Sequence, residues 1–122
     1  MAKTKVFASF DYEHDLDMKN NLIAQSRRQD SPFAVNDVSL NERLPDWQQK
    51  ARSAIEGCDV FIVLLGEHTY QAQGVLREIK MARELKKRRF QLRKTGEEPK
   101  SFNGAGEVVA WKWKNLKKWL AK

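Results

Sequence analysis

The run CDVFIVLL, residues 58–65, restricts the possible folds more than any other part of the chain. Its six consecutive apolar residues suit a β-strand and are far fewer than the ~18 that a membrane-spanning helix requires. A strand that is apolar at every position is buried on both faces, as strands are at the centre of a parallel sheet. The run therefore predicts an α/β protein, with Cys58 as a small residue of the core.

Weaker strand patterns and amphipathic helix patterns alternate along the rest of the chain. We expect strands at 5–10, in SPFAVND, at RFQLR and at EVVAW, and helices from Asp15 or Asp17 to Ser26, from Asp46 to Gly57, over 74–89 and over 114–121. Leu16, Leu22 and Ile23 are expected on or near the inner face of the first helix. This alternation predicts one α/β domain over 1–122, with a parallel sheet of about five strands in the flavodoxin-like order 2-1-3-4-5.

Polar loops follow the predicted strands and would meet at one edge of the sheet. In sheets of this type the ligand crevice lies beyond the carboxyl ends of the strands. That rule brings together Phe10–His14, Asn36–Glu42, Gly66–Tyr70 and the glycine-rich segment near residue 100. We therefore expect a binding site at this edge.

The predicted helix GVLREIKMARELKKRR, residues 74–89, carries a glutamate on its apolar face. At about 100° per residue, Glu78 falls within the arc formed by Val75, Ile79, Met81, Ala82 and Leu85. A basic residue three or four positions later commonly pairs with a helical glutamate, but those positions hold Met81 and Ala82. Near the start of its helix a carboxylate is favoured by the helix dipole, so we expect Glu78 to face a ligand in the crevice.

The chain of 122 residues has a net charge of +7 that is unevenly distributed. Nine basic and two acidic residues lie between positions 77 and 94, whereas 11–46 is net acidic. A basic run can bind nucleic acid, but it is more often a solvated helix face, and no nucleic-acid-binding motif accompanies this one. The single cysteine excludes a disulfide framework. Since no signal peptide or membrane-spanning pattern is found, we expect a soluble cytoplasmic protein.

Several classes of enzyme are excluded by missing motifs. The chain has neither the G-x-G-x-x-G of redox dinucleotide sites nor the P-loop G-x-x-x-x-G-K-[ST]. The third strand ends LLGEH, without the aspartate of a phosphoacceptor domain. His14 and His68 lack the spacing of a helical metal pair, and Ser9 and Ser39 have no evident histidine base for a hydrolase triad. We expect no metal.

One carboxylate in a polar pocket is nevertheless sufficient for one kind of reaction. Cleavage of a ribosyl bond to an already cationic nicotinamide needs little acid assistance, because the base departs neutral. It needs a carboxylate that stabilises or traps the oxocarbenium-like ribosyl centre, and walls that orient nicotinamide and ribose. Side chains suited to such walls are Phe10, Tyr12, Trp47, His68 and Tyr70.

Four segments, in order, resemble the TIR-like domains of bacteria: KVFASFDYEHD, DVSLNERLPDW, CDVFIVLLGEHTY and GVLREIKMARELKKR. The similarity is strongest to the TIR domains of the Thoeris anti-phage defence systems and to their small stand-alone relatives. The F-x-S-F opening is moderately specific. The order of the four segments, with a glutamate at the start of the helix after the third strand, is much more specific. The resemblance implies a flavodoxin-like (TIR-like) three-layer fold.

The resemblance also implies an activity. The family cleaves NAD, releases nicotinamide and makes a cyclic or variant ADP-ribose signal, so we expect an NAD glycohydrolase or ADP-ribosyl cyclase with NAD as substrate and no cofactor. The catalytic glutamate of the family matches Glu78. Substrate contacts are expected from Phe10, Asp11, Tyr12, Gly66, His68 and Tyr70, with Ser39 as a weaker candidate. Expected partners are NAD, further copies of the chain on activation and a separate effector protein that reads the signal.

The chain departs from the family in two places, and two other functions stay open. The tryptophan often found just upstream of the glutamate is missing from Gly74–Arg77, and the R-D-x-x-P-G loop of animal TIR adaptors is absent. The chain could instead be a non-catalytic TIR-like module that associates with itself or with a partner. It could also bind nucleic acid through the 77–94 run and its lysine-rich tail.

Overall fold

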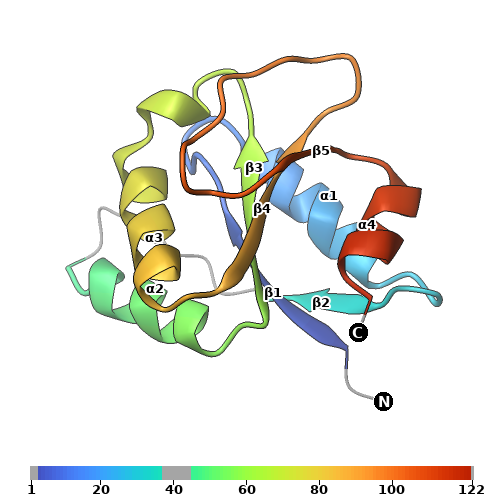
Figure 1. Cartoon of the computed structure of the whole chain (residues 1–122), viewed down its shortest axis with the longest axis horizontal. Helices are drawn as coiled ribbons and strands as arrows, with labels where there is room; N and C mark the ends of the chain where they lie inside the picture. The colour runs from blue at the N-terminus through green and yellow to red at the C-terminus, as the bar shows by residue number, and fades with distance from the viewer. Residues whose placement is uncertain (1–2, 37–44, 122) are drawn as a thin grey trace.

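The computed structural model of the chain describes residues 3–36 and 45–121. Within them, five parallel strands form one sheet in the order β2-β1-β3-β4-β5 (Figure 1), which confirms the predicted fold class and strand order. The strands are β1 Thr4–Ser9, β2 Phe33–Val35, β3 Val60–Leu65, β4 Arg88–Arg93 and β5 Val108–Ala110. The helices are α1 Leu16–Ser26, α2 Trp47–Glu56, the 3-10 helix η1 Thr69–Gln71, α3 Gln73–Glu84 and α4 Trp113–Trp119. In this described part of the chain, no helix has the length and apolar character needed to cross a bilayer.

β3 lies at the centre of the sheet and is buried along its whole length. Successive side chains of a strand point to opposite faces. Val60, Ile62 and Leu64 accordingly pack in one cluster with residues of α1 and α4, and the alternate residues of β3 pack in another with residues of α2 and α3. Helices therefore cover both faces of the sheet (Figure 1), as the continuous apolar run predicted.

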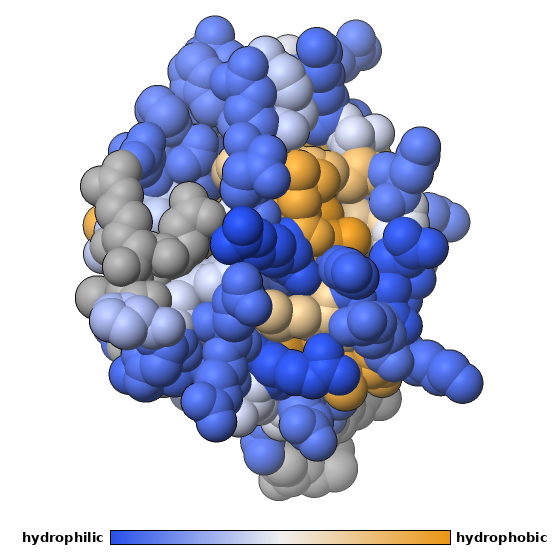
Figure 2. All heavy atoms as spheres, turned by 90° about the vertical axis from the view of Figure 1, so that its left-hand side faces the viewer, coloured by the Kyte–Doolittle hydropathy of each residue, from blue (hydrophilic) through white to orange (hydrophobic). Residues whose placement is uncertain are grey.

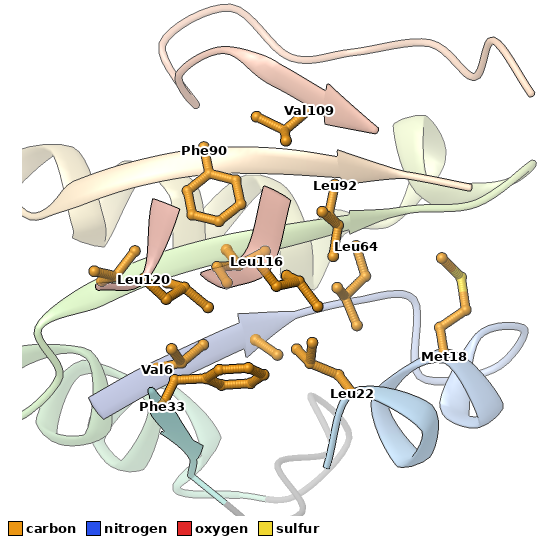
Figure 3. Close-up of a cluster of buried hydrophobic side chains, with 13 residues drawn as sticks. Val6, Met18, Leu22, Phe33, Leu64, Phe90, Leu92, Val109, Leu116 and Leu120 are labelled. Carbon is orange, nitrogen blue, oxygen red and sulfur yellow. The ribbon is translucent and has the colours of Figure 1, made fainter. Parts of the chain in front are cut away.

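The cluster beneath α1 and α4 shows which side of α1 is buried. Met18 and Leu22 belong to it together with Leu116 of α4 and Leu120, which directly follows that helix (Figure 3). The expectation for Leu16 was wrong, because this residue is 39% exposed; Ile23 is half-buried. Since α1 begins at Leu16, the pair that faces the sheet at i and i+4 is Met18 and Leu22.

The helix after β3 ends earlier than its sequence pattern predicted. α3 stops at Glu84, not at residue 89. Lys86 adopts a left-handed φ of 54°, its N–H bonds the carbonyl of Arg83, and the N–H of Lys87 bonds the carbonyl of Ala82. This is the Schellman arrangement that ends many helices. Residues 88–93 then pair with β3 as β4, so the last part of the predicted helix is a strand.

The basic run at 77–94 serves the fold in part. Lys87, Arg88 and Arg89 each donate to a backbone carbonyl of a different segment, at 2.6–2.8 Å. These three cations fasten the start of β4 to neighbouring loops and to the end of α4. The side of the molecule that carries α2 and α3 is mostly hydrophilic, around a smaller apolar area (Figure 2).

The glycine-rich loop between β4 and β5 is fastened by Gln91. The amide nitrogen of this buried side chain donates to the carbonyls of Phe102 at 3.1 Å and Gly106 at 2.7 Å, and its oxygen accepts the N–H of Phe102 at 2.8 Å. The ammonium of Lys100 lies 4.3 Å from the centroid of the Tyr70 ring. The loops after β3 and β4 therefore meet at the carboxyl edge of the sheet (Figure 1).

Candidate active site

A cavity of about 290 Å³ opens at the carboxyl end of β1, where a ligand crevice was predicted. That volume lies just below the ~300–1,000 Å³ range of ligand pockets. Its walls come from the end of β1 and the loop after it, from α1, from Trp47 at the start of α2, and from the segment between β3 and the first turns of α3.

Glu78 lies in the wall of this cavity and is 6% exposed. The hydroxyl of Ser9, which is fully buried, donates a hydrogen bond of 2.6 Å to Oε1 of Glu78. A charge-assisted hydrogen bond between two buried groups fixes the position of the carboxylate. In this buried environment, charge interactions of the carboxylate are stronger than in bulk water.

The strand and helix periodicities together bring Ser9 and Glu78 into contact. Ser9 ends β1 two positions after Phe7, so both side chains point to the same face of the sheet. Glu78 is three positions after Val75, which packs in one cluster with Phe7. The position of a glutamate on the apolar face of α3 is thus explained by a polar residue on the facing strand.

Asp11 organises the loop that follows β1. This buried carboxylate accepts the N–H of Glu13 at 3.1 Å and lies 2.7 Å from Nδ1 of His14. The Asp11 carbonyl also accepts the N–H groups of His14 and Asp15. Because an ionised carboxylate can only accept hydrogen bonds, the hydrogen on this contact belongs to Nδ1 of His14.

Aromatic rings from two loops stand together at the cavity. The rings of His14 and His68 lie 4.4 Å apart between centroids and are inclined at 38°. Phe10 and Tyr12 form a second pair at 6.1 Å. All four residues line the cavity, so the loops after β1 and β3 supply an aromatic wall.

Lys19 brings a cation into a cavity that is otherwise rich in carboxylates. It is 4% exposed, lies in the first turn of α1, and its ammonium is 5.4 Å from the centroid of the Phe10 ring. Of the described residues that line the cavity, Lys19 is the one lysine or arginine, beside the acidic residues Asp11, Glu13 and Glu78. The cavity can therefore bind a ligand that carries both a positive and a negative group.

Asp15, just before α1, ties the loop after β3 to this helix. Thr69 Oγ1 donates to Asp15 Oδ2 at 3.2 Å and accepts the N–H of Gly66 at 2.7 Å. Burial raises the pKa of Asp15 above its ordinary 3.8, although the hydrogen bond from Thr69 acts in the opposite direction. A Cβ atom at Gly66 would collide with the Asp15 carboxylate, so any other residue here would force the Asp15 side chain to move.

Most of the residues predicted for the site come together in the structure. Phe10, Asp11, Tyr12, His68 and Glu78 line the cavity, as does Trp47. Gly66 and Tyr70 do not line it, because Gly66 packs against Asp15, and Tyr70 is 38% exposed with Lys100 over its ring. Ser39 lies outside the described residues.

Ser9 and Lys19 were not assigned to the site from the sequence, and His14 was placed only within the loop expected at the crevice, without a role. Ser9 was signalled by its place at the end of the first predicted strand, and the Asp11–His14 pair by a spacing of three residues. No sequence pattern signalled Lys19. Across 3–36 and 45–121, no group of three or more His, Cys, Asp or Glu side chains is arranged to hold a metal ion.

Comparisons with known proteins agree with this fold. Residues 7–97 match the family model described as Thoeris protein ThsB, TIR-like domain. Among solved structures, the chain is similar to the CMP N-glycosidase BcmB of Clostridium botulinum, with a TM-score of 0.59, 21% sequence identity, and coverage of 96% of this chain and 94% of that one. At this identity the likeness shows a shared fold. The search of curated proteins gave no match.

Proposed function

The chain belongs to the family of TIR-like domains of the Thoeris protein ThsB, and we propose that it is an NAD-cleaving signalling enzyme of anti-phage defence with Glu78 as its catalytic carboxylate. The reaction releases nicotinamide and converts the remainder of NAD into a cyclic or variant ADP-ribose. Self-association on activation and a separate effector that reads the product are part of the same proposal. The observation that carries it is the buried Ser9–Glu78 pair in the wall of an open cavity.

Glu78 suits the bond-breaking step. As the bond from ribosyl C1′ to the nicotinamide nitrogen breaks, its electron pair leaves with the base, which becomes neutral. Positive charge then develops on C1′ and the ring oxygen of the ribose. A carboxylate held in advance by Ser9 can stabilise or trap that charge with little rearrangement.

The charges of the cavity favour NAD over a nucleotide with a neutral base. NAD joins a cationic nicotinamide to an anionic pyrophosphate. The carboxylates of Asp11, Glu13 and Glu78 suit the cationic part, and the ammonium of Lys19 suits a phosphate. A neutral base such as cytosine would need a general acid to protonate it as it leaves, whereas nicotinamide leaves without one.

The similar fold of a CMP N-glycosidase supports the coarser part of the proposal, because it makes N-glycosidic cleavage compatible with this architecture. It also names the competing substrate. The test is to incubate the protein with NAD and, in parallel, with CMP, at several dilutions up to its highest soluble concentration, and to follow the products by mass spectrometry. We expect nicotinamide and ADP-ribose species from NAD and no cytosine from CMP. Release of cytosine in preference to nicotinamide would overturn the substrate assignment.

A non-catalytic interaction module is the competing function. Such a module needs no occupied cavity, and Glu78→Gln would leave its partner affinity and self-association intact. An enzyme instead loses nicotinamide release on that substitution while it keeps its fold, because a glutamine oxygen can still accept the hydrogen bond from Ser9.

A further inference from the structure

Resting on the proposed cleavage of NAD, we propose that His14 is a second catalytic residue, the general base that activates an oxygen nucleophile after nicotinamide has left, and that Asp11 positions it. The geometry that points to this role is the contact of 2.7 Å between Asp11 Oδ2 and His14 Nδ1, in a cavity whose wall also contains Glu78.

The contact with Asp11 sets which nitrogen of His14 keeps a lone pair. Since Nδ1 carries the hydrogen, the neutral imidazole presents the lone pair of Nε2. Asp11 is itself held, because its Oδ1 accepts the N–H of Glu13, and the ring of His68 lies 4.4 Å from that of His14. A base oriented by a carboxylate is the arrangement that activates hydroxyl nucleophiles and water.

The exposures of His14 and Glu78 suit the two halves of the reaction. The His14 side chain is 48% exposed, whereas Glu78 is 6% exposed. Glu78 therefore holds the ribosyl centre within the cavity, and His14 stands where an acceptor enters from solvent. Glu78 thus acts on C1′ and His14 on the acceptor oxygen, the two atoms that the new bond joins.

The step balances as follows for water as the acceptor. The water oxygen forms a bond to C1′ while one of its protons moves to Nε2 of His14. The imidazolium then releases that proton to solvent, so NAD and water give nicotinamide, ADP-ribose and one proton. A ribose hydroxyl that closes a ring within the same molecule requires the same proton transfer. When the acceptor is instead the pyridine nitrogen of a second nicotinamide, it has no proton to lose, so the step needs no base.

That difference between acceptors gives a direct test. The protein is incubated with NAD and isotopically labelled nicotinamide, and mass spectrometry follows both the formation of ADP-ribose and the exchange of label into NAD. In the exchange reaction the acceptor is the ring nitrogen of the labelled nicotinamide. Exchange therefore shows that a variant is folded and still breaks the ribosyl–nicotinamide bond. The variants are His14→Gln, Asp11→Asn and, as a matched acid of α1 that does not line the cavity, Asp17→Asn.

We expect His14→Gln to lower the ratio of hydrolysis to exchange by about 10²-fold or more, and Asp11→Asn to lower it by roughly 10-fold or more. Asp17→Asn should keep the ratio of the unmodified protein. If His14→Gln exchanges and hydrolyses with an unchanged ratio, His14 is not the base, and the proposed cleavage of NAD still stands. If the unmodified protein shows neither reaction, both proposals are overturned.

Discussion

The hydroxyl of Ser9 at the end of β1 donates a hydrogen bond of 2.6 Å to Oε1 of Glu78 on α3. This bond crosses from the sheet to a helix that packs on it, between residues 69 positions apart in the sequence. It turns an isolated charge on an apolar helix face into a positioned carboxylate at the wall of a cavity. The proposed chemistry depends on that position.

Replacing Ser9 by alanine should weaken both the site and the fold. A hydrogen bond to a charged group contributes about 1.5–3 kcal/mol, so we expect Ser9→Ala to lower the free energy of unfolding by up to that amount. We also expect it to slow nicotinamide release by roughly 10-fold or more. Urea unfolding and product assays measure the two effects. The control is Ser26→Ala, which removes the hydroxyl of a buried serine at the end of α1 and should leave the activity unchanged. Full activity in Ser9→Ala would contradict the role of the Ser9–Glu78 bond.

Lys19→Met should weaken substrate binding. Methionine is apolar and of similar length, so it removes the charge of this buried side chain with little change in its volume. We expect the variant to raise KM for NAD by about 10-fold or more, with little change in kcat, because it loses a contact with a phosphate. Lys80→Met, on the exposed face of α3, makes the same change in net charge and should leave KM as it was. An unchanged KM in Lys19→Met would remove Lys19 from the proposed site.

Gly66→Ala should destabilise the rim where the loop after β3 meets α1. The added methyl group would collide with the carboxylate of Asp15, and overpacking of this kind costs about 1–3 kcal/mol. Gly57→Ala is the matched control, since its φ is −84° and its new Cβ would lie 3.6 Å from the nearest atom, the carbonyl oxygen of Ser53. We expect the control to be neutral or slightly stabilising. Equal unfolding midpoints for the two variants would show that Asp15 moves without cost.

Asp15 should give the fold a measurable pH dependence. Burial raises its pKa above 3.8 in the folded state, so the folded protein binds this proton more tightly than the unfolded chain does. The stability linked to the group is fully present below pH 3.8 and is lost as the pH rises through the raised folded-state pKa. Asp15→Asn keeps an acceptor for Thr69 but does not ionise, so its free energy of unfolding relative to the unmodified protein should increase from acidic to neutral pH and then level off. Urea unfolding at a series of pH values tests this, and a difference that does not vary with pH would contradict it.

The central strand and the place of Glu78 could be predicted because they depend on local periodicity and on the crevice rule for parallel sheets. The strand order could be predicted because it is a common order for an α/β chain of this length. The six buried residues of β3 and the buried arc of α3 follow directly from apolar spacing. The end of α3 did not follow, since the helix stops at Glu84 and Arg88 and Arg89, the last two residues of the predicted helix, pair with β3 as the start of β4.

The neighbours of Glu78 could not be read from the sequence in the same way. The contact with Ser9 requires β1 and α3 to pack together, and the burial of Lys19 depends on how α1 sits against the loop after β1. The contact of His14 with Asp11 is local, but its importance appears only when both line the same cavity as Glu78.

The rate of nicotinamide release from NAD by Glu78→Gln, compared with Glu84→Gln, tests the central claim most directly. Both substitutions remove one carboxylate from α3, but Glu84 is exposed and pairs with Arg52 away from the cavity. We predict that Glu78→Gln loses roughly 10³-fold or more of the activity while its melting temperature stays close to that of the unmodified protein, and that Glu84→Gln keeps the activity. Nicotinamide release by a folded Glu78→Gln at the rate of the unmodified protein would contradict the account.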